Sequence, residues 1–306
     1  MKSIFKQKQI AAFFILGVLT LIWVPAWGQE NRTQFEVSGF IDWAPGEVNI
    51  EASFNLAQAG IRLPTGRFMG EEILREAHTR LLRPYLLSLV LDSNSTIRDL
   101  VNRGEVSLEE LDTLSQGSGK NPPSLSADLT RMIGRYTVNI EKISAFLTRN
   151  RRAVEAPVPL IPAGAADYTG IIIIADEELP VRGRKTNVLA GPCLFPKIWD
   201  TNMNLVYDIN MIEYSRKEGA LMVRYTVPEN IFRPTPSGLE GELAALAGPY
   251  PLRILAREVF GINQTDLVIT RDDALKILST GNNRRLLREG RVVLVLNEKM
   301  LKTQSE

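Results

Sequence analysis

The chain has 306 residues, of which 44% are hydrophobic and 23% charged. This composition is typical of a globular protein, and the length suits two domains of roughly 150 residues each. A single histidine and a single cysteine exclude an intramolecular disulfide, a zinc site of several cysteines and histidines, and a multi-histidine metal centre. We therefore expect no catalytic, metal or cofactor-binding residues, and we expect that the protein is not an enzyme.

The first thirty residues predict export. Three lysines among the first eight residues are followed by an uncharged apolar stretch from Ile10 to Val24, which Pro25 ends. Ala26 and Gly28 are small residues at the two positions that a signal peptidase reads. We predict a signal peptide over residues 1–28 and cleavage before Gln29. The alternative is an uncleaved membrane anchor, because the apolar stretch nearly reaches spanning length.

The exported chain is close to electrically neutral. Removal of the three leader lysines leaves 33 basic and 35 acidic residues. This balance gives no electrostatic reason to expect nucleic acid, or an anionic membrane, as the main partner. No cysteine sits at the cleavage point, so we expect a protein that is not a lipoprotein. We expect it in the periplasm or the extracellular space, with no integral membrane segment after cleavage.

The first half reads as a strand pair followed by helices. Apolar and polar residues alternate over 35–39 and 48–52, with a Pro45-Gly46 turn between them, which predicts a hairpin. Helical spacing then runs from Met69 to Leu91, and Pro84 should kink or divide that helix.

Shorter elements and a boundary come next. Ser95 or Thr96 starts a short helix through Val101, and Ser107 opens a capping box. Alternation from Arg135 to Ile143 predicts a strand. The segment from Ala156 to Ala166 has three prolines and no charge, which is typical of a linker.

The second half interleaves strands with helices. Ile171 to Ile174 are four successive β-branched residues, which indicates a strand buried on both faces. Further strands are predicted at 194–199, 205–208, 254–260, 266–270 and 292–296, and helices at 239–247 and 272–279. The fold class is therefore α+β or α/β, with two small mixed domains, each a sheet packed with helices. The predicted boundaries are 29–155 for the first domain, 156–166 for the linker, 167–297 for the second domain and 298–306 for a tail.

Several motifs of the second half resemble a known family when they are taken together. They are Tyr168-Thr169-Gly170 before an apolar strand, Leu194-Phe195-Pro196-Lys197-Ile198-Trp199-Asp200, Pro251-Leu252-Arg253-Ile254, Thr265-Asp266-Leu267-Val268-Ile269-Thr270 and Asp272-Asp273-Ala274. The set is similar to that of exported bacterial proteins related to the Lpp-twenty surface lipoproteins and to the N-terminal region of flagellar assembly protein T, over 167–297 and more loosely over 35–155. The resemblance implies envelope or flagellar protein partners and supplies no catalytic residues.

The best candidate for a ligand site is the loop after the buried strand. In α/β proteins ligands bind at the carboxyl ends of the strands, and Asp176 closes the strand from Ile171 to Ile174. We therefore expect a binding edge formed by Asp176, Glu177, Arg182 and Arg184.

Other residues have simpler interpretations. We interpret His78 and Cys193 as packing residues, with a ligand or base role for His78 beside Glu71 as the alternative. Asp266, Asp272 and Asp273 fit helix capping, with a cation site as the alternative. The sequence from Gly117 to Lys120 resembles the end of a phosphate loop, but Leu114 stands where that loop needs a glycine.

Arginines gather at two places in the sequence, namely Arg149, Arg151 and Arg152, and Arg284, Arg285, Arg288 and Arg291. We expect solvated faces or partner contacts there, with an anionic glycan or a lipid headgroup as the alternative ligand. Together these observations favour a non-enzymatic exported envelope protein with a binding or assembly role, associated with the flagellum or the outer membrane. Two alternatives stay open: a periplasmic glycan- or small-molecule-binding module, and a hydrolase that uses carboxylates alone.

Overall fold

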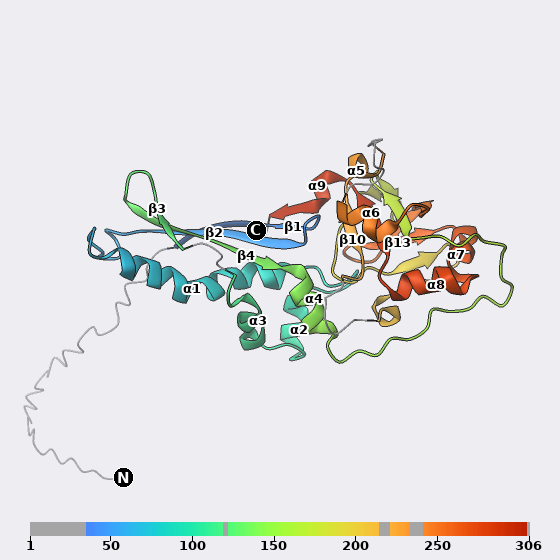
Figure 1. The fold of residues 1–306 in the computed structure, drawn as a ribbon, viewed down its shortest axis with the longest axis horizontal. Helices are drawn as coiled ribbons and strands as arrows, with labels where there is room; N and C mark the ends of the chain where they lie inside the picture. The colour runs from blue at the N-terminus through green and yellow to red at the C-terminus, as the bar shows by residue number, and fades with distance from the viewer. Residues whose placement is uncertain (1–34, 119–121, 214–220, 233–240, 305–306) are drawn as a thin grey trace, which may run out of the picture. The chain divides into compact units, whose positions relative to one another are not determined.

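The computed structural model describes residues 35–118, 122–213, 221–232 and 241–304, and the structural statements below concern these ranges. The predicted leader, residues 119–120 of the phosphate-loop-like sequence and the start of the helix predicted over 239–247 lie outside them. Within these ranges the chain forms two domains of mixed helices and sheets (Figure 1). The predicted α+β fold class is confirmed.

An antiparallel sheet in the order β15-β1-β2-β4-β3 builds the N-terminal domain. Its strands are β1 (Phe35–Asp42), β2 (Glu47–Asn55), β3 (Ser124–Leu125), β4 (Arg131–Asn139) and β15 (Lys302–Gln304). Every second residue of β2 from Val48 to Phe54 is buried, because the side chains of a strand point alternately to its two faces. The predicted hairpin is confirmed, and Gly46 takes a positive φ of 70° in its turn.

The helix α1 (Arg67–Ser88) covers the apolar face of this sheet (Figure 1). The helices α2 (Ile97–Asn102) and α3 (Leu108–Ser115) pack against α1, and α4 (Ile140–Thr148) packs against β4. The predicted helix start at Thr96 and the predicted capping box at Ser107 are confirmed, and Thr96 also has a capping box. Of the kink or division predicted at Pro84, the division is wrong: α1 continues to Ser88, and Leu82 and Leu86 on either side of the proline are fully buried in the core.

The strand predicted over 135–143 is partly wrong. The strand β4 ends at Asn139, and α4 begins at Ile140. The side chain of Asn139 accepts a hydrogen bond from the backbone N–H of Glu141 at 2.6 Å, which caps the helix. Ile140 and Ile143 are then buried at helical spacing, a period that the strand-like alternation before them hides.

A parallel sheet in the order β10-β14-β5-β11 forms the core of the second domain. Its strands are β5 (Ile171–Ala175), β10 (Arg224–Thr226), β11 (Leu252–Leu255) and β14 (Val292–Leu296). Ile172 packs with Val293 and Val295 under the helix α6 (Gly241–Ala247), whereas Ile173 packs into the main core on the opposite face. The prediction that this strand is buried on both faces is confirmed.

The remaining strands are β8 (Ile198–Asp200), β9 (Leu205–Tyr207), β12 (Glu258–Phe260) and β13 (Asp266–Ile269) in one sheet, and β6 (Leu179–Pro180) with β7 (Asn187–Val188) in another. The strand predicted over 254–260 is two strands. The chain changes sheets there, because the N–H of Ala256 bonds to Ile174 while that of Arg257 bonds to Val268.

The strand predicted over 194–199 is also shorter than expected. The N–H groups of Leu194 and Phe195 bond to the carbonyls of Val90 and Leu91 in the N-terminal domain, so these residues do not enter the sheet. The other helices are α5 (Pro228–Phe232), α7 (Arg271–Leu278), α8 (Gly281–Arg288) and α9 (Glu298–Leu301), with a 3₁₀ turn at Ile209–Met211.

More than one connection joins the two halves. The linker residues 156–166 form neither helix nor strand. Residues 298–304, which the sequence assigns to a tail, contain α9 and β15, and β15 pairs with β1 of the N-terminal domain. Among the described residues, no helix is long and apolar enough to span a membrane.

Candidate functional site

The helix α8 has well-defined ends. Thr280 accepts a hydrogen bond from the N–H of Asn283 through its side chain, which begins the helix. At the other end Gly290 has a positive φ of 65°, and its N–H bonds back to Leu287. A glycine in this conformation just after the last turn is a common helix stop.

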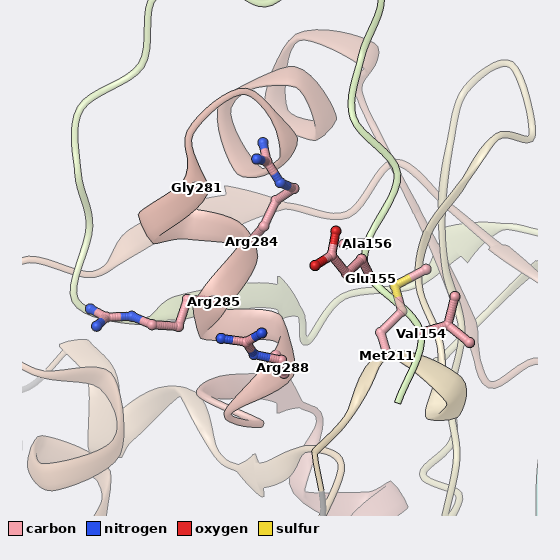
Figure 2. A pocket seen from close by; sticks show the side chains of 8 residues that line it. All are labelled: Val154, Glu155, Ala156, Met211, Gly281, Arg284, Arg285 and Arg288. Carbon is pink, nitrogen blue, oxygen red and sulfur yellow. The ribbon is translucent and has the colours of Figure 1, made fainter. Parts of the chain in front are cut away.

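Three arginines on one face of α8 line one pocket. Arg284, Arg285 and Arg288 follow Gly281 at the spacing that places residues on the same helical face. Together with Val154, Glu155, Ala156 and Met211 these residues line a cavity of about 130 Å³ (Figure 2). The residues of α8 that are buried are Asn283, Leu286 and Leu287, so the arginines lie on its outer side.

The arginines are oriented by weak or neutral contacts. Arg284 donates to the carbonyl oxygen of Leu278 at 2.5 Å, at the end of α7. Arg285 donates to Asn282 at 2.8 Å, and its nearest carboxylate, Glu289, is 3.5 Å away. Arg288 lies 3.5 Å from Glu213, a side chain that is 70% exposed. Exposed ion pairs of this kind contribute roughly 0–1 kcal/mol, so they leave the guanidinium groups available to a ligand.

Glu155 is the acidic residue that lines the pocket itself. Its carboxylate points toward the space between Arg284 and Arg288 (Figure 2). No ion pair of Glu155 within 4 Å is found among the described residues. The pocket therefore holds three positive charges and one unpaired negative charge. Guanidinium groups bind phosphate and carboxylate through charge-assisted hydrogen bonds, so this arrangement suits an anionic group.

In two larger cavities the lining arginines are already bonded to other residues of the protein. A hollow of about 680 Å³ beside β1 is lined by Glu51 and Arg135, which pair with each other at 2.8 Å. Another, of about 280 Å³, is lined by Arg149 and Arg151. Arg149 bonds to Glu110 and stacks on Phe146, whereas Arg151 bonds to Asn210, so these arginines are engaged within the protein.

The predicted binding edge is spread over a loop. Asp176 follows β5, and its backbone carbonyl accepts a bond from Asn297 at 3.0 Å. Arg182 donates to Glu258 and to the carbonyl of Thr201 at 2.6 and 2.9 Å, and these bonds fix it against the second sheet. Glu177 and Arg184 are exposed. None of these four residues lines the cavities described here.

His78 and Cys193 have internal contacts. The His78 ring stacks on Tyr136 at 5.0 Å between centroids, and its Nδ1 lies 2.6 Å from the carbonyl of Arg75. Cys193 is buried, and burial raises the pKa of its thiol, which keeps it protonated. The backbone of Cys193 bonds to the hydroxyl of Tyr225. These contacts fit packing roles.

The three aspartates of the alternative cation site have different roles. Asp266 is buried and accepts bonds from Ser93, the N–H of Lys197 and Trp199. Asp273 bonds to Thr270 and Lys276 at the start of α7, as the capping interpretation predicts. Asp272 is exposed. Within the described part of the chain, no three metal-ligand side chains lie together.

The helix that carries the arginine pocket was missed by the sequence prediction. Arg284, Arg285 and Arg288 stand out as a cluster, but Gly281-Asn282-Asn283 has low helix propensity and hides the start of α8. Two residues could have predicted α8 from the sequence: Thr280 as the residue that caps its start, and Gly290 as the glycine that ends it. Nothing in the sequence near α8 indicates that residues 154–156 lie beside it.

The fold and the pocket define a two-domain α+β protein with a basic cavity on its second domain. Residues 34–146 match the family model of the N-terminal domain of Treponema pallidum Tp0624. Residues 170–298 match that of the second domain of the same protein. The chain is therefore similar to two consecutive Tp0624 domains, with the linker between the two matches. A comparison with curated proteins found no match. The resemblance to Lpp-twenty lipoproteins and flagellar assembly protein T stays an expectation.

Proposed function

We propose that this protein is a non-enzymatic, exported binding protein of the bacterial envelope that holds an anionic group in the arginine pocket of α8. The observation that carries the proposal is that Arg284, Arg285 and Arg288 line one cavity whose single acidic lining residue is Glu155. The predicted leader supports export, and the resemblance supports an envelope or flagellar setting with protein partners.

A phosphate group fits the pocket in charge and size. The lining side chains alone, three guanidinium groups and one carboxylate, sum to about +2, and the exposed Glu289 and Glu213 beside Arg285 and Arg288 offset part of that charge, so a small anion suits the site. A cavity of about 130 Å³ holds a single such group with some water, not an extended polymer. The lining residues offer one carboxylate and no hydroxyl, thiol or imidazole, which favours binding over catalysis at this site.

Titration calorimetry of the purified protein with inorganic phosphate tests the proposal. Each charge-assisted hydrogen bond contributes roughly 1.5–3 kcal/mol, so the double variant Arg284→Gln with Arg288→Gln should bind phosphate at least about tenfold more weakly. The control Arg253→Gln removes one exposed arginine from β11, outside the pocket, and should leave binding unchanged. Equal affinity in the double variant and the wild type overturns the proposal.

The variant Glu155→Gln provides a test with the opposite sign. It removes the negative charge that faces the bound anion and keeps the shape of the side chain, so phosphate should bind several-fold more tightly. The gain should shrink as salt concentration rises, because counterions screen exposed charges. Weaker binding would mean that Glu155 is part of the ligand contact and would contradict this arrangement.

A further inference from the structure

A second feature lies next to the arginine pocket. The linker carries three large apolar side chains in water: Val158 and Ile161 are 64% and 83% exposed, and Leu160 is fully exposed. The segment from Ala156 to Ala166 contains no charged residue. Apolar side chains gathered on one segment commonly mark an interaction site.

Hydrogen bonds fix both ends of this apolar segment beside α8. Val154, Glu155 and Ala156 line the arginine pocket, and the N–H of Val154 bonds to Asn210. After the segment, the N–H of Ala163 bonds to the hydroxyl of Ser279 at 2.9 Å. The chain then runs on toward β5, so the segment passes alongside α7 and α8 (Figure 1).

The fully buried Asn283 of α8 makes the second attachment. Its side chain accepts a bond from the N–H of Tyr168 and donates one to the carbonyl of Ala166, each at 3.0 Å. Three prolines restrict the backbone between the attachments, so little conformational entropy is lost when the segment is fixed in a complex. These bonds attach the segment that carries Leu160 and Ile161 to the domain that carries the arginines.

We propose that the apolar segment and the arginine pocket together dock on an anionic lipid bilayer. Leu160 and Ile161 enter the boundary between headgroups and acyl chains, and Arg284, Arg285 and Arg288 contact lipid phosphates. This inference rests on the proposed function, because the lipid phosphate is the anion that occupies the pocket. It names the bilayer as the source of that anion.

Two features favour a bilayer over a protein partner. The exposed apolar side chains lie on a segment that forms neither helix nor strand, and none of them lines a cavity described above. A bilayer accepts such side chains without shape complementarity. Basic residues beside apolar ones are the combination that binds peripheral proteins to anionic lipid, where a single signal gives only marginal binding. In the described ranges no helix spans a membrane, so this contact is peripheral.

Vesicle flotation tests the inference, with vesicles of phosphatidylcholine alone or mixed with phosphatidylglycerol. The wild type should float only with the mixed vesicles. The double variant Leu160→Ser with Ile161→Ser should lose at least about tenfold in vesicle binding while it binds inorganic phosphate as the wild type does. The control Phe68→Ser removes another exposed apolar side chain, 69% exposed, at the start of α1 and should float normally. A retained leader would carry the protein to both vesicle types, so the dependence on phosphatidylglycerol excludes that cause.

The outcomes separate the two proposals. Normal flotation of the Leu160→Ser, Ile161→Ser variant overturns the bilayer proposal and leaves phosphate binding standing. Normal flotation of the Arg284→Gln, Arg288→Gln variant overturns the headgroup contact. If the wild type ignores mixed vesicles but binds phosphate, the bilayer is the wrong source of the anion. If it binds neither, the proposed function itself fails.

Discussion

Asp266 is a carboxylate that the fold buries almost completely between the two domains. It accepts hydrogen bonds from Ser93 of the N-terminal domain at 2.9 Å, and from the N–H of Lys197 and the indole of Trp199 at 3.0 Å. Burial raises the pKa of Asp266, and these bonds lower it in part. The pKa of Asp266 in the folded protein lies above the ordinary aspartate pKa. At pH values between these two pKa values, the folded protein therefore binds more protons than the unfolded chain does. The contribution of Asp266 to stability therefore falls as pH rises through that window.

Loss of the Ser93 hydroxyl should lower the stability of the protein mainly when Asp266 is ionised, because the hydroxyl donates a hydrogen bond to that carboxylate. The variant Ser93→Ala removes one donor from the buried carboxylate, so at neutral pH it should lower the free energy of unfolding by about 1–3 kcal/mol. The pKa of Asp266 then rises further, and the loss should shrink once the pH falls below the ordinary aspartate value. Urea melts of the variant and the wild type, at neutral pH and at a pH below the ordinary aspartate pKa, measure this loss in the free energy of unfolding. The control Ser88→Ala loses a bond to the backbone carbonyl of Tyr85 and should show the same cost at both.

At the scale of elements, prediction from sequence succeeds where one local signal decides the structure. Four successive isoleucines leave no polar side for β5, and Thr96, Ser107 and Thr270 each cap the helix that the sequence predicts. Prediction fails where hydrogen bonds to backbone groups far away in the sequence decide where a strand begins or ends. The bonds from Leu194 and Phe195 to the N-terminal domain shorten β8, and no local pattern shows them.

The two covered faces of β5 give a direct stability prediction. Ile172 and Ile173 have no exposed surface and belong to different clusters on opposite sides of the sheet. Ile172→Ala and Ile173→Ala should each lower the free energy of unfolding by about 2–5 kcal/mol, through lost burial and the cavity left behind. Leu255→Ala on the neighbouring strand β11 is the control: its side chain is 57% exposed, so it should cost clearly less. Denaturant melts in which one isoleucine tolerates alanine would show that one face of β5 is open.

At the scale of the whole molecule, net charge is a poor guide to partners. The nearly neutral net charge of the chain gives no electrostatic reason to expect an anionic membrane as its main partner. The fold gathers Arg284, Arg285 and Arg288 on one helical face, where they line a pocket with one acidic lining residue, Glu155. Local charge decides binding because exposed charges act over about 10 Å, much less than the size of the molecule. The linker next to α8 adds the apolar part of the surface, and only the folded chain brings the two together.

The association of the two halves provides a last prediction. Trypsin should cut first at the exposed Arg151 and Arg152, before the linker. The fragments should nevertheless elute together from a size-exclusion column, because β15 pairs with β1, Ser93 bonds to Asp266 and Arg224 pairs with Glu141 across the cut. They should separate in denaturant. A chain that ends at Leu301 lacks β15 and should release its fragments at a lower denaturant concentration. Separate elution of the wild-type fragments in native buffer would show that the linker alone holds the domains together.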